Sequence, residues 1–485
     1  MAMLVCIAIN SDYDGKENRH VPSVTRIDGT RKHHGHQTEV LLRVVDRHRG
    51  FLMMCTCYTT FVNCSSLFQA HIVSDLHMTI GQYNTGTSLA SLISIVATLF
   101  MGALIDKLGA RQIASFLVIL SALLLFGYSA VTSAWQIYAL AAISGTLITS
   151  GVRLFISVVV TNWFNLKRGL AVSAALCGSG FGGMILSPIA STVIANYGWR
   201  TAYVVLGMIC LVAALPIPVI FFRTKPSEKG LLPLGAELSD EEIKEAERKS
   251  GHSLSEVNVA VGWKVLRKHA GFWLLVLGFL FVGIINGAVS VNMVSNMTSV
   301  NNNGTEVVTG GHSVVWAGYI MSLYMGVVLV AKVVLGWIFD RFGMVGGVLV
   351  GSVSCLLACL FLCFPSTNWG PILAAVFYGI GTCTATIGPS IMIAHEYGRR
   401  DVGKLTGIAI SATALGGIVG AIVSGIAFDA ALSFTPAWVI GIVCSVFMGV
   451  ALIASAGMAK GVVAKCIANG APHIDAEGNI LEEAR

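Results

Sequence analysis

Charged residues are scarce in this sequence. Asp, Glu, Lys and Arg make up 12% of its 485 residues, whereas about a quarter of the residues of an ordinary soluble domain are charged. Hydrophobic residues account for 55% of the chain, and its mean hydropathy is +0.76. This composition excludes a soluble globular protein and predicts a polytopic membrane protein, because a lipid-facing surface must itself be apolar.

Groups that carry catalysis or bind metals are also missing from the apolar stretches. The 12 histidines avoid the middle of these stretches, and the 12 cysteines form no Cys-x-x-Cys pair. The glycine-rich "GSGFGG" at 178–183 lacks the preceding strand and the Gly-Lys-Ser/Thr of a phosphate loop. We therefore expect no enzymatic activity, no cofactor and no metal site.

Long apolar runs recur along the whole chain. A membrane-spanning helix needs roughly 20 apolar residues, and twelve such runs can be marked. The predicted spans are 51–73, 85–105, 112–131, 136–160, 169–194, 201–222, 271–297, 315–338, 345–364, 369–394, 405–428 and 436–458. The predicted fold is an all-α membrane protein with 12 transmembrane helices.

Polar segments divide the spans into two groups of six. The predicted units are a disordered tail at 1–49, an N-terminal half at 50–222, a linker at 223–268, a C-terminal half at 269–458 and a tail at 459–485. Lys and Arg gather in the tails, the linker and the connections on one side, which is the cytoplasm by the positive-inside rule. Both termini are thus predicted to be cytoplasmic. The formal charge of +6 reflects these segments facing anionic lipid, so we expect the lipid bilayer and no nucleic acid as a partner.

The two halves are related as repeats. "GALIDKLG" at 102–109 recurs as "GWIFDRFG" at 336–343, an offset of 234 residues that also carries Gly182 onto Gly416. Two pseudo-symmetric halves packed about a midplane cavity are a recurring design of secondary transporters.

The extended motif "GALIDKLGAR" at 102–111 resembles the loop signature of the major facilitator superfamily, Gly-x-x-x-Asp-(Arg/Lys)-x-Gly-x-(Arg/Lys). This resemblance covers about residues 50 to 460 and implies a carrier that works by alternating access. It also implies gating residues in this loop and its repeat, although a capped turn without a gating role stays open as an alternative. The candidate gating residues are Gly102, Asp106, Lys107, Gly109, Arg111, Asp340 and Arg341.

Within the superfamily, the stretches at 161–188 and 197–207 resemble the monocarboxylate porters and the oxalate/formate antiporter branch. In these branches a helix 8 arginine stands four residues before a glycine, and Lys332 holds that place before Gly336. The sequence differs from these branches at two places, so their substrates and proton coupling cannot be assigned to this chain. The stretch matching the second cation of the oxalate/formate branch carries none here, and Val328 stands where monocarboxylate porters often have an acid.

Two cations lie within predicted spans, Arg153 and Lys332, each very roughly 12–15 Å from the predicted cytoplasmic boundary. No acid lies at a comparable depth. The nearest candidates fall at span ends or in loops: Asp75, Asp106, Glu306, Asp340, Glu396, Asp401 and Asp429. A desolvated charge without a partner is costly, and a transported anion would balance it. Water-solvated or carbonyl-bonded structural roles stay open.

Uncharged polar residues of the spans could complete such a site, although each is also a candidate for a helix–helix hydrogen bond. The candidates are Asn63, Thr149, Asn286, Tyr324, Tyr378 and Thr382.

The predicted function is alternating-access transport of a small organic anion, a mono- or dicarboxylate, by a monomer in a plasma or cytoplasmic membrane. Without an acid or histidine at midplane, anion exchange or facilitated diffusion is favoured over proton symport, but protons and a counter-anion both stay open as coupling partners. One alternative is a carrier or efflux pump for neutral or amphipathic solutes, with structural cations. Another is a membrane sensor that binds a ligand without transporting it.

Overall fold

The computed structural model of the chain describes residues 50–89, 91–93, 110–163, 172, 175–216, 266–267, 269–397 and 402–468. Within them, apolar sequence forms helices throughout both predicted halves. The elements of the N-terminal half are η1 (Met54–Tyr58), α3 (Thr59–Val62), α4 (Ser65–Asp75), α6 (Ala110–Ser129), α7 (Ala134–Ile143), η2 (Ser144–Ser150), α8 (Gly151–Trp163) and α10 (Gly178–Ala214). Residues 80–89, here called the 80–89 helix, are also helical.

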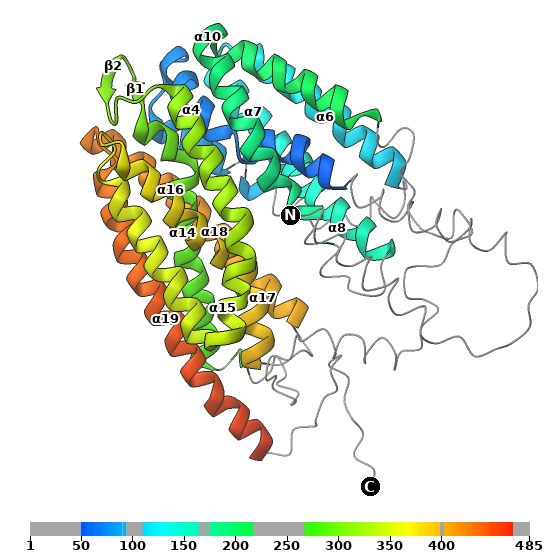
Figure 1. Cartoon of the computed structure of the whole chain (residues 1–485), viewed down its shortest axis with the longest axis vertical. Coiled ribbons are helices and arrows are strands. Elements are labelled where there is room, and N and C mark those ends of the chain that lie inside the picture. Colours follow the sequence, from blue (N-terminus) through cyan, green and yellow to red (C-terminus); the bar gives the residue numbers. More distant parts are fainter. Residues whose placement is uncertain are drawn as a thin grey trace, which may run out of the picture.

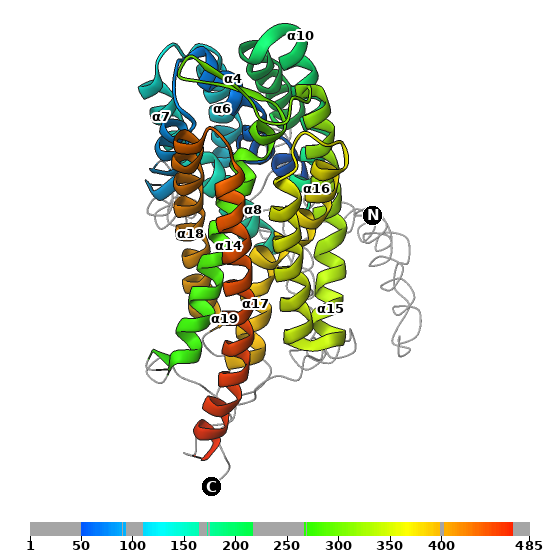
Figure 2. The same ribbon diagram turned by 90° about the vertical axis from the view of Figure 1, so that its left-hand side faces the viewer.

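The C-terminal half contains α14 (Ala270–Met297), β1 (Ser299–Asn302), β2 (Thr305–Val308), α15 (Val314–Leu362), α16 (Trp369–Gly381), α17 (Cys383–Tyr397), α18 (Val402–Ala431) and α19 (Thr435–Ala468). Figure 2 shows its helices running along one another in a single bundle.

Ten segments of the described chain are long and apolar enough to cross a membrane. One of them, Gly178–Ala214, is two helices joined at Gly198, where φ is 82°, and these correspond to the predicted spans 169–194 and 201–222. Similarly, α15 turns at Gly343, where φ is 71°. Glycine suits both turns because it has no Cβ to oppose a positive φ. The predicted span 85–105 continues outside the described residues, so the total of twelve stays a prediction.

The two halves meet at one end and diverge toward the other (Figure 1). The end at which they meet carries the strands β1 and β2, and we call it the hairpin side. Contacts between the halves pair α4 with α14 and β1, and α10 with α15. The molecule therefore has the shape of a carrier closed at the hairpin side.

Glycines at the predicted repeat positions occupy equivalent contacts. A Cβ on Gly182 would lie 2.1 Å from the backbone oxygen of Cys55, in the first helix of its half. A Cβ on Gly416 would lie 2.1 Å from the backbone oxygen of Leu280, in α14, the first helix of the other half. Small residues at such crossings let membrane helices approach closely. The glycines follow the offset of 234 residues, whereas their partners in the first helices, Cys55 and Leu280, are 225 positions apart.

The hairpin is a departure from the predicted all-α fold. Strands β1 and β2 pair antiparallel, with Asn302 opposite Thr305. Asn303 and Gly304 between them have φ angles of 50° and 88°. Asn-Gly is the preferred pair for this two-residue turn, so the local sequence contained a signal that the search for long apolar runs passed over.

We expect Gly287→Ala to destabilise the C-terminal half. A Cβ there would lie 1.9 Å from the backbone oxygen of Gly417, so the two helices must separate. Overpacking of this kind costs roughly 1–3 kcal/mol and should lower the thermal unfolding midpoint in detergent. The matched control is Gly457→Ala, whose Cβ meets nothing within 4 Å; it should be neutral or slightly stabilising, and equal effects of the two changes would contradict the close crossing.

Candidate functional site

Lys332 lies on the side of α15 that faces the N-terminal half. Three and seven residues before it, Leu329 and Met325 contact the glycines of α10: a Cβ on Gly180 would lie 4.0 Å from the Leu329 Cβ, and one on Gly183 would lie 2.7 Å from the Met325 Cγ. Residues spaced by three, four or seven share a helix face. The Lys332 side chain is half-buried. It lies further along α15 than these contacts, away from the hairpin side.

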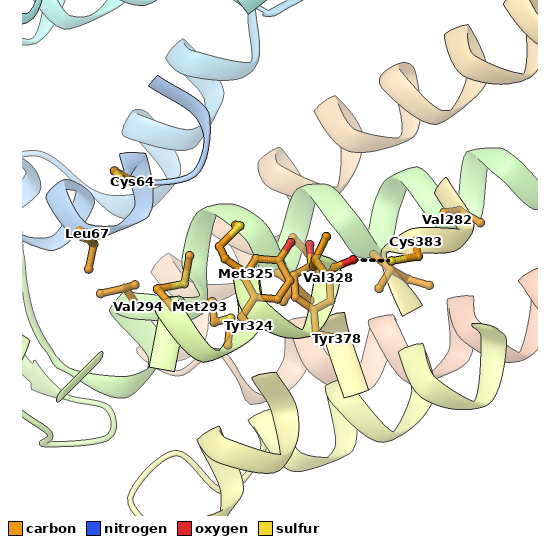
Figure 3. Packing of buried hydrophobic residues seen from close by; sticks show 14 of the residues in the cluster. Cys64, Leu67, Val282, Met293, Val294, Tyr324, Met325, Val328, Tyr378 and Cys383 are labelled. Carbon is orange, nitrogen blue, oxygen red and sulfur yellow. Dashed lines mark hydrogen bonds between the residues drawn. The ribbon is translucent and has the colours of Figure 1, made fainter. Parts of the chain in front are cut away.

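The side of α15 that faces lipid is not the side that carries Lys332. Its exposed residues near this level are Val330, Val333, Val334 and Trp337. Val328, one turn before Lys332, is buried instead, and its backbone oxygen accepts a hydrogen bond from the Cys383 thiol at 3.7 Å (Figure 3). The ammonium group of Lys332 thus belongs to the interior of the bundle.

Arg153 lies in the first turn of α8, directly after the π-helix η2, and its side chain is exposed. The buried residues of α8 include Val152, Phe155, Ile156 and Val159, and Arg153 lies off the face that they define. Ser157, one turn further on, donates its hydroxyl to the Arg153 backbone oxygen at 2.9 Å. A charged side chain in a spanning helix faces the bundle interior or water far more often than lipid.

Neither cation has an acidic partner among the residues that the structure describes. Asp75 pairs with Arg200 at the hairpin side, and Asp429 accepts from the backbone of Gly81. Glu396 is buried near the other end, where it accepts a hydrogen bond from Ser455 of α19 at 3.0 Å. The guanidinium of Arg153 and the ammonium of Lys332 likewise form no side-chain hydrogen bond to a described residue.

Four of the predicted polar residues form one cluster between α14, α15 and α16. Thr382 donates its hydroxyl to Asn286 Oδ1 at 2.8 Å, and the Tyr378 hydroxyl donates to the Asn286 backbone oxygen at 3.3 Å. Tyr324 and Tyr378 stack with ring centroids 4.9 Å apart (Figure 3). Tyr324 stands eight residues before Lys332, two turns along the same helix. The cluster therefore lies about 12 Å from Lys332 along α15.

The other predicted residues fall elsewhere. Asn63 donates to the backbone oxygen of Ser179 at 2.8 Å, a bond within the N-terminal half. Thr149 lies in η2, and its side chain is outside the description. Among the predicted gating residues, Arg111 and Arg341 are exposed; Gly102, Asp106, Lys107, Gly109 and the Asp340 side chain lie outside the described residues.

Three of the predicted spans contain irregular backbone. The first and fourth predicted spans contain π-helices, Met54–Tyr58 and Ser144–Ser150, and the tenth is interrupted at Thr382 between α16 and α17. Such π-segments are rare and occur often at functional sites, and irregular backbone at membrane depth is tolerated where protein buries it or water lines it. Residue composition carries no signal for these breaks, so the sequence analysis missed them.

The family of the protein follows from its sequence as a whole. A family model described as Major Facilitator Superfamily matches residues 50–368 and 309–460. The chain belongs to this superfamily. It is therefore a multi-pass membrane transporter and not an enzyme, as the loop motif and the composition predicted.

Similar proteins of this superfamily differ in their named solutes. The chain is 26% identical to the riboflavin transporter RibJ of Trypanosoma brucei brucei over 42% of this chain and 37% of RibJ. It is 24% identical to monocarboxylate transporter 12 of Xenopus laevis over 38% of each chain. The crystal structure of the nucleoside transporter NupG superposes with a TM-score of 0.64 at 14% identity, covering 85% of this chain and 98% of NupG. This last likeness confirms the major facilitator fold.

We expect Thr382→Val to destabilise the protein more than Thr382→Ser. Valine keeps the shape but leaves the Oδ1 of the half-buried Asn286 without its donor, at a cost of roughly 1–3 kcal/mol, whereas serine keeps the hydroxyl. Thermal unfolding of the two purified variants in detergent checks this order. Equal midpoints would mean that the bond of 2.8 Å contributes nothing to stability.

Proposed function

We propose that this transporter carries a small organic anion, a mono- or dicarboxylate, and that Arg153 and Lys332 bind it. The observation that carries the proposal is the absence of an acidic partner for either cation in the described part of the chain. Lys332 is half-buried and Arg153 is exposed, and both lie in spanning helices. A charge in such a helix that no protein group neutralises requires water or a ligand of opposite sign.

The placement of the two residues supports a shared cargo. Arg153 belongs to the N-terminal half, and Lys332 lies on the face of α15 directed toward that half. The guanidinium can donate two parallel hydrogen bonds to one carboxylate, while the ammonium adds a compact positive charge. An anion held between the halves would stay bound while the halves rock about it. This rocking motion exposes the site of a carrier of this fold to each side of the membrane in turn.

The polar cluster supports a site of limited size. The Asn286, Tyr378 and Thr382 groups bond to one another, and the stacked Tyr324 and Tyr378 rings are buried. They form a rigid wall two helical turns from Lys332 along α15, and such a wall suits a small solute rather than a large one. We place them as supporting residues of the site, with Asn63 and Thr149 on the opposite half.

Coupling follows from the same groups. No acid or histidine of the described spans lies next to Arg153 or Lys332. Anion exchange or facilitated diffusion is therefore favoured over symport with a proton carried by the protein. We further propose a monomer with the halves 50–222 and 269–458, both termini in the cytoplasm, in a plasma or cytoplasmic membrane. The residues 102–111 and 340–341 would then gate the cytoplasmic side.

The similar proteins support either of two cargo classes. Monocarboxylate transporter 12 is named for an anion, while the names of RibJ and NupG refer to riboflavin and nucleosides. A carrier for neutral solutes would leave both cations in structural roles, so removing their charge distinguishes the two.

We expect Arg153→Met and Lys332→Met each to lower carboxylate transport roughly 10- to 100-fold, because each removes a hydrogen bond to a charged group worth roughly 1.5–3 kcal/mol. The measurement is counterflow in proteoliposomes across a panel of mono- and dicarboxylates, with and without a pH gradient. Lys332→Arg should retain part of the activity because it keeps the charge.

The matched control is Arg267→Met, which removes an exposed cation outside the spans and should leave counterflow unchanged. Full transport by both Met variants would refute an anion site built on these cations. Uptake of neutral solutes that survives both changes would support the rival carrier, and ligand binding without any flux would support a sensor.

A further inference from the structure

A network of amide and hydroxyl side chains joins the halves at the hairpin side. It consists of Gln69 in α4, Asn84 in the 80–89 helix, Asn292 and Ser295 in α14, and Ser424 in α18. All five are fully or almost fully buried. We call these five residues the amide network.

Four hydrogen bonds of the amide network cross between the halves. Gln69 Nε2 donates to Asn292 Oδ1 at 3.0 Å, and Asn84 Nδ2 donates to the same oxygen at 3.0 Å. Asn84 Nδ2 also donates to the backbone oxygen of Ala421 at 3.1 Å, and the Ser295 hydroxyl donates to Gln69 Oε1 at 2.6 Å.

Asn292 is the centre of the network. Its oxygen accepts from one residue of each of two N-terminal helices, while its Nδ2 donates to the Ser424 hydroxyl at 2.8 Å and to the Ala288 backbone oxygen at 2.9 Å. Both polar atoms of this buried amide are thus satisfied twice. The oxygen keeps its two partners only while the halves touch, whereas the partners of Nδ2 belong to the same half as Asn292.

A second layer of bonds caps the network toward the hairpin. Asn302 Oδ1 accepts from the Ile80 backbone N–H at 2.9 Å, and Asp429 Oδ2 accepts from that of Gly81 at 3.1 Å. Asn302 Nδ2 donates to Asp429 Oδ1 at 3.2 Å. The hairpin and the end of α18 together hold the start of the 80–89 helix, which belongs to the other half.

The second crossing between the halves is built differently. With the repeat offset of 234 residues, Asn84 corresponds to Gly318 and Gly425 corresponds to Ser191. Each pair meets: a Cβ on Gly425 would lie 3.0 Å from Asn84 Nδ2, and one on Gly318 would lie 2.0 Å from Ser191 Oγ. The Ser191 hydroxyl, however, donates to Pro188 of its own helix. The equivalent crossing is linked instead by the Ser322 hydroxyl, which donates to the Met184 backbone oxygen at 2.6 Å. The amide network is therefore specific to one of the two crossings.

We propose that the amide network is the lock that holds this carrier closed on the hairpin side, with Asn292 as its central residue. Access from that side requires its four cross-half hydrogen bonds to break together. This role is independent of the cargo, so it stands or falls separately from the anion site.

The test measures access from the hairpin side, the outer side if the predicted orientation holds. In a background without native cysteines, Ser88→Cys serves as the reporter. Ser88 is 4% exposed and lies one turn from Asn84 on the same helix face. A membrane-impermeant maleimide applied to each side of the membrane in turn should label it slowly in the otherwise unchanged carrier.

Asn292→Ala should raise the labelling rate from the hairpin side about tenfold, because it removes two of the four cross-half hydrogen bonds, those that Gln69 and Asn84 donate to Asn292 Oδ1. Ser295→Ala removes one donor and should give a smaller rise of about threefold. It also keeps the test informative if Asn292→Ala does not fold.

The matched control is Asn296→Ala. Asn296 lies one turn further along α14 and is equally buried, but its amide bonds only Leu362 and Trp438 of its own half. It should lower thermal stability without changing the labelling rate. No rise with Asn292→Ala and Ser295→Ala, or an equal rise with Asn296→Ala, would overturn the lock.

Discussion

The structure depends on one constraint: in the bilayer core there is no water to satisfy a polar group, so each group must find a partner within the protein or line an aqueous path. The amide network obeys this rule completely, since Asn292 alone takes part in four hydrogen bonds. Arg153 and Lys332 do not obey it within the described residues. The contrast separates groups that hold the molecule together from groups that are free to meet a solute.

Close helix packing also contributes to holding each half together. Glycines such as Gly182, Gly416 and Gly287 bring helices of one half into direct backbone contact, which makes each half a rigid unit. Between the halves, close approaches at Gly318 and Gly425 occur together with side-chain hydrogen bonds at the hairpin side. Rigid units with a reversible seam are what rocking motion requires, because the seam can open without disturbing the packing on either side of it.

The sequence predicted those features that depend on local composition. Apolar runs located the spans, the repeat placed Gly182 and Gly416 in equivalent contacts, and the shortage of acids singled out Arg153 and Lys332. The sequence could not show which polar residues bond to one another. Asn84 and Asn292, for example, are separated by 208 positions and meet only after the halves fold together. The same holds for Asn286 and Thr382, which were named as separate candidates and turn out to share a bond. The π-helices were missed because they do not change the hydropathy of their segments, and the hairpin was missed because it lies in a short polar connection between two apolar runs.

The neutral composition of the amide network has a consequence for turnover. An ion pair buried in a membrane would resist separation strongly, since the attraction between two charges is hardly screened in a dry interior. An amide or hydroxyl exchanges a protein partner for a water molecule at nearly equal free energy. An interface of this kind is stable while it is dry and separates once water reaches it. Hydration of a few side chains is therefore enough to start each transport cycle.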